Sequence, residues 1–232
     1  MIEVIAFDAD DTLWHNEVLY QDAQQAFQRI LSPWAQPQAV AARLDKIELH
    51  NMPLYGYGIK AFMLSMIETA NLMSGGEITG EEIEKILTVG RSMLHAEVTL
   101  FPHVEDTLRS LSETFRLMMI TKGDPLDQTR KVERSQLGRY FSQVEIVHDK
   151  TRQSYQDVLG KYHLDPRGFI MVGNSLRSDV APILELGGIA IHIPAETSWD
   201  HEDIPDFDNT QKGYYHLENI KQLPQLLQNI SK

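Results

Sequence analysis

Short apolar runs alternate with amphipathic segments along this sequence, which leaves few folds open to it. Five runs rich in Val, Ile, Leu, Phe and Met have the length of strands: Val4–Phe7, Leu117–Ile120, Val144–Val147, Phe169–Val172 and Ile189–Ile193. Helical patterns separate the later runs, at about residues 125–135, 151–162 and 178–186. Because short buried strands alternating with helices are typical of parallel sheets covered on both faces, the sequence predicts a doubly wound α/β core.

The first crossover is much longer than a strand–helix–strand unit requires. About 100 residues lie between Trp14 and Arg116, where roughly 30 would suffice, and most of them have a helical pattern. Helices are expected at 17–31, 38–50, 59–73 and 79–96, with 51–53 closing the second and a capping box of Thr79 and Glu82 opening the last. The sequence therefore predicts a core formed by 1–15 and 99–232 and an all-helical cap domain at 16–98.

Composition narrows the function. The 232 residues carry 21 Lys and Arg against 33 Asp and Glu, a net charge of −12, which disfavours nucleic acid and anionic membranes as partners. The absence of cysteine excludes disulfides, thiolate metal ligands and a cysteine nucleophile. No basic leader or run of 18 apolar residues is present, so a cytoplasmic location is expected. Oligomeric state is left open.

The part of the chain that follows Pro194 is acidic and irregular. It contains five carboxylates within nine residues: Asp200, Glu202, Asp203, Asp206 and Asp208. A short strand at 214–217 and a final helix at 220–230 are expected after it.

Polar residues occupy or closely follow the ends of four predicted strands. The segments are Asp8-Ala9-Asp10-Asp11-Thr12, Thr121-Lys122-Gly123-Asp124, Asp149-Lys150, and Gly173-Asn174-Ser175-Leu176-Arg177-Ser178-Asp179. Ligands of open parallel sheets bind at the carboxyl ends of the strands. We therefore expect these four segments to meet at one edge of the sheet.

The chemistry of these segments favours a divalent cation and a phosphate group. Asp8 and Asp10 are two residues apart, so in extended backbone their side chains point the same way and require a cation or a shared proton. Oxygen ligands without sulfur or a histidine cluster favour Mg²⁺. Asp179 adds a third carboxylate, and Lys150 and Mg²⁺ would balance the three, which leaves a near-neutral site able to accept a phosphate dianion.

The four segments, in this order, resemble the four motifs of the haloacid dehalogenase (HAD) superfamily. Phe7-Asp8-Ala9-Asp10-Asp11-Thr12 matches the first motif, DxDx[T/V] after a strand, and Thr121 and Lys150 match the second and third. The fourth, typically GDxxxxD, is matched at Gly173 and Asp179 but has Asn174 in place of its first Asp. The resemblance covers the whole chain and implies a Rossmann-like core with an inserted helical cap.

The resemblance implies a phosphatase with defined roles. Asp8 corresponds to the nucleophile that accepts the phosphoryl group, and Asp10 to the general acid and base. Thr121, Lys122, Gly123 and Lys150 would hold phosphoryl oxygens. Mg²⁺ would be bound by Asp8, the Asp10 carbonyl, Asp179 and, more weakly, Asn174. The expected substrate is a small phosphorylated metabolite.

Other interpretations stay open at this point. A 2-haloacid dehalogenase shares the fold and nucleophile, but such enzymes usually lack the second aspartate of the first motif, which is Asp10 here. A phosphomutase, or a binding or regulatory module without turnover, is also compatible, and Asn174 favours the latter. In the cap, Tyr57 and Lys60 are candidate substrate contacts, although a helix–helix turn with packed tyrosines explains Tyr55-Gly56-Tyr57-Gly58 equally well.

Overall fold

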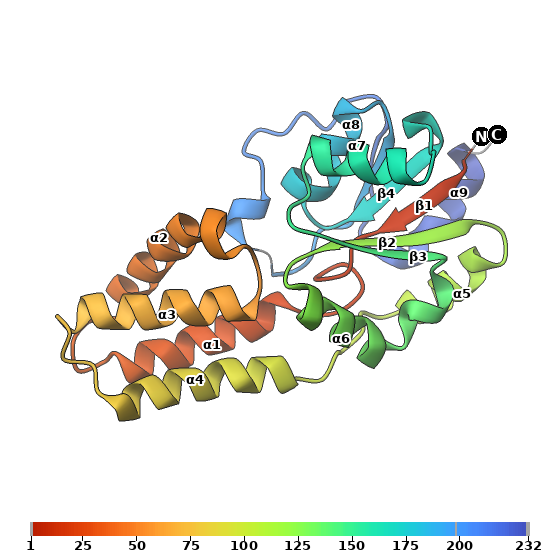
Figure 1. Ribbon diagram of the computed structural model, residues 1–232. Coiled ribbons are helices and arrows are strands. Elements are labelled where there is room, and N and C mark those ends of the chain that lie inside the picture. Colours follow the sequence, from red (N-terminus) through yellow and green to blue (C-terminus); the bar gives the residue numbers. More distant parts are fainter. Residues whose placement is uncertain (1, 198, 231–232) are drawn as a thin grey trace. The chain divides into compact units, whose positions relative to one another are not determined.

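The computed structural model describes residues 2–197 and 199–230, and the chain divides into two compact units (Figure 1). The first consists of Met1–Glu17, Val98–Lys122 and Gln128–Lys232, and the second of Val18–Glu97 with Gly123–Asp127. Whether the inserted helices form an independently folding cap domain at 16–98 stays a prediction.

The first unit is built on a six-stranded sheet. Its strands are β1 (Val4–Phe7), β2 (Arg116–Lys122), β3 (Gln143–Val147), β4 (Phe169–Gly173), β5 (Ile189–His192) and β6 (Tyr214–His216). They lie in the order β3-β2-β1-β4-β5-β6, and every neighbouring pair is parallel. The predicted doubly wound α/β fold is confirmed. With this strand order the ends of β1, β2 and β4 meet at the centre of one edge of the sheet.

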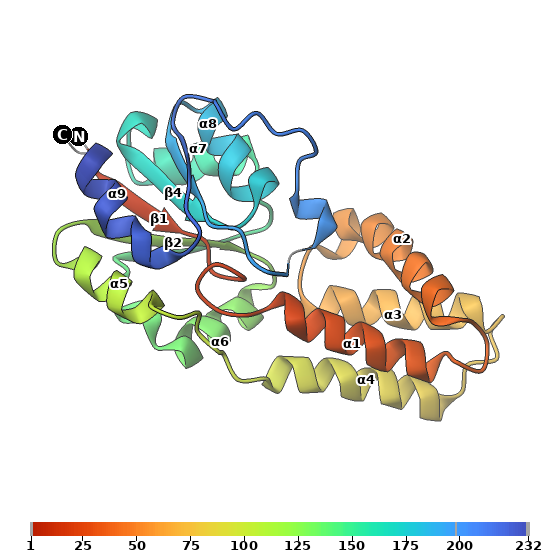
Figure 2. The ribbon, with the colours of Figure 1, turned by 180° about the vertical axis from the view of Figure 1, so that it is seen from behind.

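Helices cover both faces of this sheet (Figures 1 and 2). Alternate strand residues such as Phe7, Met119 and Val172 pack with α5 (Val104–Ser112) and α9 (Leu223–Ile230). The intervening residues, such as Ala6 and Met171, pack with α7 (Arg152–Lys161) and α8 (Ala181–Glu185) on the opposite face. Burial on both faces explains why these strands are continuous apolar runs.

The second unit contains α1 (Glu17–Ile30), α2 (Pro37–Tyr55), α3 (Ile59–Met73) and α4 (Gly80–His95). They share a core that includes Phe27, Leu44, Phe62, Met66 and Ile86. The predicted capping box at the start of α4 is present, with Glu82 N–H donating to the Thr79 hydroxyl. In the described residues, no helix combines the length and the apolarity that a bilayer crossing needs.

The final helix, α9, begins after a 3-10 turn, three residues later than predicted, and two other helices differ in ways that need a physical explanation. The second helix does not close at 51–53, because α2 runs through Pro53 to Tyr55. Pro53 lies in the last turn, where its missing N–H forfeits only one backbone bond, and the Gly56 N–H bonds to the Met52 carbonyl at 2.9 Å.

The predicted helix at 178–186 is in fact a π-helical turn, Leu176–Val180, followed by the short α8. The Val180 N–H reaches the Ser175 carbonyl at 3.2 Å, five residues back, and the Ser175 hydroxyl caps the Ser178 N–H at 2.8 Å. This wider turn carries Asp179, which is 1% exposed. Single π-turns of this kind are frequent at functional sites.

Candidate active site

The carboxylate of Asp8 is anchored at the end of β1. The Asp8 N–H donates to the Val172 carbonyl of β4 at 2.8 Å, so its backbone is fastened to the neighbouring strand. The Thr12 hydroxyl donates to Oδ2 at 2.9 Å, and the Lys150 ammonium contacts Oδ1. The side chain is 8% exposed. Asp8 is therefore a buried carboxylate held at both oxygens.

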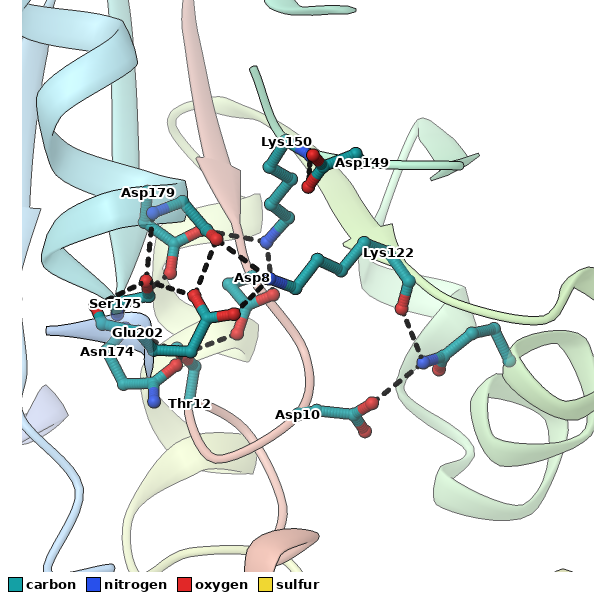
Figure 3. A network of polar contacts seen from close by, with 12 residues as sticks. Asp8, Asp10, Thr12, Lys122, Asp149, Lys150, Asn174, Ser175, Asp179 and Glu202 are labelled. Atoms are coloured by element: carbon teal, nitrogen blue, oxygen red, sulfur yellow. Dashed lines mark hydrogen bonds and ion pairs between the residues drawn. The ribbon is translucent and has the colours of Figure 1, made fainter. Parts of the chain in front are cut away.

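Lys150 lies between two carboxylates that come from distant segments (Figure 3). Its Nζ contacts Asp8 Oδ1 and lies 2.8 Å from Asp179 Oδ1, and its side chain is 1% exposed. Burial lowers the pKa of Lys150, but Asp179 and Asp8 outweigh burial and raise it, so Lys150 stays protonated. One ammonium thus serves two carboxylates.

The pKa of Asp8 reflects its burial and the negative charge that Lys150 leaves unbalanced. Burial raises the pKa of Asp8 to about 7; Lys150 opposes this shift, and the Asp179 carboxylate adds to it. A nucleophilic carboxylate has to be ionised, and a nearby divalent cation favours the ionised form. Asp8 and Asp179 together carry one more negative charge than Lys150 balances, and a bound cation would supply the missing positive charge.

The carboxylate of Asp10 does not point toward that of Asp8, contrary to the prediction from their two-residue spacing (Figure 3). It accepts hydrogen bonds from Trp14 Nε1 at 2.6 Å, Gln128 Nε2 at 2.7 Å and Lys131 Nζ at 3.0 Å. The physical reason is that β1 ends at Phe7, so the alternation of an extended strand does not continue, and Asp11 adopts a left-handed conformation with φ 60°.

These partners also set the charge of Asp10. Burial raises its pKa, but the Lys131 ammonium and the hydrogen bonds from Gln128 and Trp14 outweigh burial and lower it. In this arrangement Asp10 is ionised and is neutralised by Lys131 rather than by a group next to Asp8.

The donor set that fits a cation consists of Asp8, the Asp10 backbone carbonyl and Asn174. The inward-facing terminal atom of the Asn174 amide lies 3.3 Å from both Asp8 Oδ2 and the Asp10 carbonyl oxygen. With its amino group inward, Asn174 donates to both oxygens; with its carbonyl inward, three oxygens converge as Mg²⁺ ligands do. The same amide can therefore satisfy the site with or without the ion.

Asp179, like Asp8, is a predicted ligand that contacts the Lys150 ammonium. Its Oδ2 accepts the Ser175 N–H at 3.0 Å, and a Cβ at Gly173 would lie 2.2 Å from that oxygen, so only glycine leaves room for this carboxylate. Among the described residues, no three acidic or histidine side chains are grouped tightly enough to hold a metal by themselves. Backbone and amide oxygens are needed to complete a metal site.

Thr121 lies near the end of β2, next to β1. It is 1% exposed, and its hydroxyl has no hydrogen-bond partner in the described part of the chain. Since Met119 pairs with Phe7, the last residue of β1, Thr121 extends beyond the strand end that carries Asp8. A buried hydroxyl without a hydrogen bond costs folding free energy, and a bound anion would accept that hydrogen bond.

Several groups of this site were not identified from the sequence. The Thr12 hydroxyl holds Asp8, and Trp14, Gln128 and Lys131 hold Asp10. Gln128 and Lys131 are one turn apart on α6 (Pro125–Ser135), which is a detectable spacing. The largest omission is Glu202, which contacts Lys122, Ser175 and Ser178.

The predicted cap contacts belong to the second unit. Lys60 of α3 forms an ion pair of 2.7 Å with Asp124, and a Cβ on Gly58 would lie 3.3 Å from the Asp124 nitrogen. Gly123 has φ 135°, a conformation that favours glycine. Roles for Tyr57, Lys60 and Gly123 in substrate binding stay predictions.

The sequence matches a family model described as haloacid dehalogenase-like hydrolase over residues 2–187. Human N-acylneuraminate-9-phosphatase is 24% identical over 161 residues, which are 67% of this chain and 63% of that protein. The chain thus spans less than two thirds of the length of the curated relatives it matches.

Two solved structures extend this comparison. A haloacid dehalogenase-like family hydrolase from Xanthomonas campestris is 32% identical, with a TM-score of 0.88 and coverage of 99% of this chain and 91% of that chain. A 2-haloacid dehalogenase from Pseudomonas syringae pv. Tomato DC3000 is 23% identical, with a TM-score of 0.65 and coverage of 99% and 100%. The second likeness shows the shared fold alone.

Proposed function

The chain belongs to the haloacid dehalogenase-like hydrolase family, and from this premise we propose that it is a Mg²⁺-dependent phosphatase acting on a small phosphate monoester. The observation that carries the proposal is the arrangement around Asp8. This buried carboxylate shares the Lys150 ammonium with Asp179, has two further oxygens close to it, and lies beside the strand end that carries the Thr121 hydroxyl, which has no partner among the described residues. A cytoplasmic location and a phosphorylated metabolite as the partner are part of the same proposal.

Asp8 would attack the phosphorus atom of the ester. The bond from phosphorus to the ester oxygen breaks, and the phosphoryl group is transferred to a carboxylate oxygen of Asp8 as an aspartyl phosphate. Thr121 donates a hydrogen bond to a phosphoryl oxygen, and the Lys150 ammonium offsets its charge. Water then attacks the same phosphorus and restores Asp8 with release of inorganic phosphate.

Asp10 would carry the proton in both steps. It gives a proton to the leaving alkoxide and takes one from the attacking water. Because Lys131, Gln128 and Trp14 hold it ionised in this arrangement, the acid form requires that Asp10 leave Lys131. These three residues would therefore control when Asp10 can take up and transfer a proton.

Asp8, the Asp10 carbonyl and Asn174 would hold Mg²⁺. Asp179 is connected to Asp8 through the Lys150 ammonium that both carboxylates contact. When bound, the ion supplies positive charge that offsets the phosphoryl oxygens and keeps Asp8 ionised. The proposal of a metal site rests on this donor set and on the excess negative charge shared by Asp8 and Asp179.

The first test is hydrolysis of para-nitrophenyl phosphate with Mg²⁺ and with excess chelator. We expect chelation to lower the rate more than about 100-fold, since the charge stabilisation from a metal is worth several kcal/mol, and we expect added Mg²⁺ to restore it. Chloride release from a 2-chloroacid that persists in chelator would instead identify a dehalogenase. Absence of both activities would favour a binding module.

A second prediction concerns Asn174. Asn174→Asp should tighten Mg²⁺ binding about tenfold or more, because a carboxylate replaces a neutral amide next to Asp8 and the Asp10 carbonyl. Without metal the same change should lower the melting temperature, because the amino group that satisfies those oxygens is lost. Calorimetric titration with Mg²⁺ and thermal unfolding with and without it measure both effects. Unchanged metal affinity and rate would contradict this reading.

A further inference from the structure

Glu202 brings a carboxylate from the acidic segment after β5 to the motifs of the candidate site (Figure 3). Its Oε2 accepts hydrogen bonds from the Ser175 hydroxyl at 2.5 Å and the Ser178 hydroxyl at 2.6 Å, and its Oε1 contacts the Lys122 ammonium. The Glu202 and Lys122 side chains are 14% and 18% exposed. Burial raises the pKa of Glu202, but Lys122 and the two hydroxyls outweigh burial and lower it, so Glu202 is ionised.

The three donors around this carboxylate are of the kind that bind anions. An ammonium and two hydroxyls from separate segments converge on two oxygens, which is the recognition that a phosphate oxygen or another carboxylate also receives. Lys122 also donates to Ser178 Oγ at 2.8 Å, so the donors are linked to one another.

These donors are adjacent in the chain to the residues assigned to phosphate and metal. Lys122 follows Thr121, whose buried hydroxyl lacks a partner in the described part of the chain. Ser175 follows Asn174, and Ser178 precedes Asp179. Gln128 Nε2 donates to the Lys122 backbone carbonyl at 2.9 Å and to the Asp10 carboxylate at 2.7 Å. Lys122 is thus connected to Ser178 through its ammonium and, by way of Gln128, to Asp10 through its backbone carbonyl.

The Glu202 carboxylate lowers the net positive charge of this site. Asp8, Asp179 and Lys150 sum to −1, and a bound Mg²⁺ would make the sum +1. Asp10 is balanced by Lys131, and Lys122 is balanced by Glu202. Without the Glu202 carboxylate the sum would be +2, so Glu202 withholds one full positive charge from a phosphate dianion.

Glu202 lies in a largely exposed and irregular segment. Between 194 and 212, no described residue is fully buried, and one short turn, Asp200–Glu202, is the regular structure there. Phe207, which is partly buried, packs against Tyr214 with ring centroids 5.1 Å apart. The side-chain contacts of Glu202, together with a hydrogen bond of 3.1 Å from the Ser175 hydroxyl to the Glu202 backbone carbonyl, join this segment to the candidate site.

We propose that Lys122, Ser175 and Ser178 form an anion-binding subsite beside Asp8 and that Glu202 occupies it as an internal competitor of the phosphate group. The proposal rests on the phosphatase function proposed above for the same site. A dianion that enters takes over donors from Glu202, and after hydrolysis the carboxylate returns and weakens the hold on inorganic phosphate. Glu202 would be a specificity-determining residue that limits product inhibition.

The test is the affinity for inorganic phosphate, measured by calorimetry in the presence of Mg²⁺, which requires no turnover. We expect Glu202→Gln, which keeps the size and removes the charge, and Glu202→Ala, which empties the subsite, to bind phosphate about tenfold more tightly than the unmodified protein. Lys122→Met should weaken binding. In a Lys122→Met background, removing Glu202 should gain much less, because the ammonium it competes for is absent.

Glu145→Gln is the matched control. Glu145 on β3 is 16% exposed and pairs with Lys161 at 2.8 Å, so it resembles Glu202 in burial and pairing but contacts none of the site residues named here. It should leave phosphate affinity unchanged. Unchanged or weaker phosphate binding in both Glu202 variants, with melting temperatures near that of the unmodified protein, would overturn the subsite.

The two proposals fail in different ways. If para-nitrophenyl phosphate is hydrolysed normally while the Glu202 variants bind phosphate as the unmodified protein does, only the subsite is wrong. If no phosphate ester is hydrolysed, the proposed function fails, while the calorimetric comparison still decides whether Glu202 competes with an anion.

Discussion

Replacing Asp8 with asparagine is expected to lower phosphate-ester hydrolysis by at least about 10³-fold, the scale on which loss of a nucleophile acts. A carboxamide cannot form the aspartyl phosphate, although it occupies almost the same space as the carboxylate. The change leaves the Thr12 and Lys150 side chains in place. Initial rates with para-nitrophenyl phosphate and Mg²⁺ measure the loss.

The same variant should not lose stability, which separates a catalytic effect from a folding defect. Burial raises the pKa of Asp8 to about 7, above that of an unfolded aspartate, so its ionised form costs folding free energy near pH 7 when no cation is present. Asparagine removes that charge and leaves Lys150 paired with Asp179 alone. The metal-free melting temperature should stay level or rise.

Asp165→Asn is a suitable control for this experiment. Asp165 is 40% exposed and pairs with Arg167 near β4, away from the residues assigned to the site. Its rate should stay within about twofold of the unmodified protein, because surface ion pairs contribute little. Substantial turnover by Asp8→Asn would count against covalent catalysis and in favour of direct attack by water.

Replacing Lys150 with methionine is expected to harm both stability and turnover. Two carboxylates, Asp8 and Asp179, would be left buried without their shared ammonium. Removing one partner of a buried ion pair costs about 3–5 kcal/mol, and for a chain of this size each kcal/mol lowers the melting temperature by about 2–4 °C. Turnover should fall to background, because the charge that offsets the phosphoryl oxygens is lost.

Added Mg²⁺ tests whether the instability of Lys150→Met comes from the lost positive charge. A divalent cation at Asp8 replaces part of the missing charge, so Mg²⁺ should raise the melting temperature of Lys150→Met more than that of the unmodified protein. The control is Lys161→Met, which removes a lysine that is 58% exposed and pairs with Glu145. It should cost less than about 1 kcal/mol. A Lys150→Met protein as stable as the unmodified one would contradict the shared-ammonium arrangement.

Much of this architecture was predictable because it depends on local patterns and on general rules of sheet topology. Apolar runs as short as Val4–Phe7 predict buried parallel strands, and the capping box of Thr79 and Glu82 predicts a helix start. Once the strands are parallel, residues at their carboxyl ends share an edge. The gathering of the segments that carry Asp8, Lys150 and Asp179 at one edge follows from this rule, whereas the pairing of their side chains does not.

Two of the failed predictions assumed that the backbone continues regularly, whereas a third, the helix end at 51–53, assumed a break that the chain does not make. Asp10 was expected beside Asp8 on the assumption of an extended chain, but the strand ends at Phe7 and the chain turns at Asp11. The helix expected from Ser178 begins instead as a π-helical turn, because the Ser175 carbonyl accepts from residues four and five positions ahead. A turn of the backbone at Asp11 decided the first outcome, and two hydrogen bonds to the Ser175 carbonyl decided the second.

The parallel α/β core, the helical insertion after the first strand and the set of strand-end residues could all be predicted from the amino-acid sequence, because periodicity and turn chemistry act over a few residues. The partner of each charged group could be identified only from the folded chain. Lys131 neutralises Asp10, Lys150 is shared by Asp8 and Asp179, and Glu202 reaches Lys122 across 80 residues. Such pairings depend on distances between segments remote in the chain, and no local pattern encodes them.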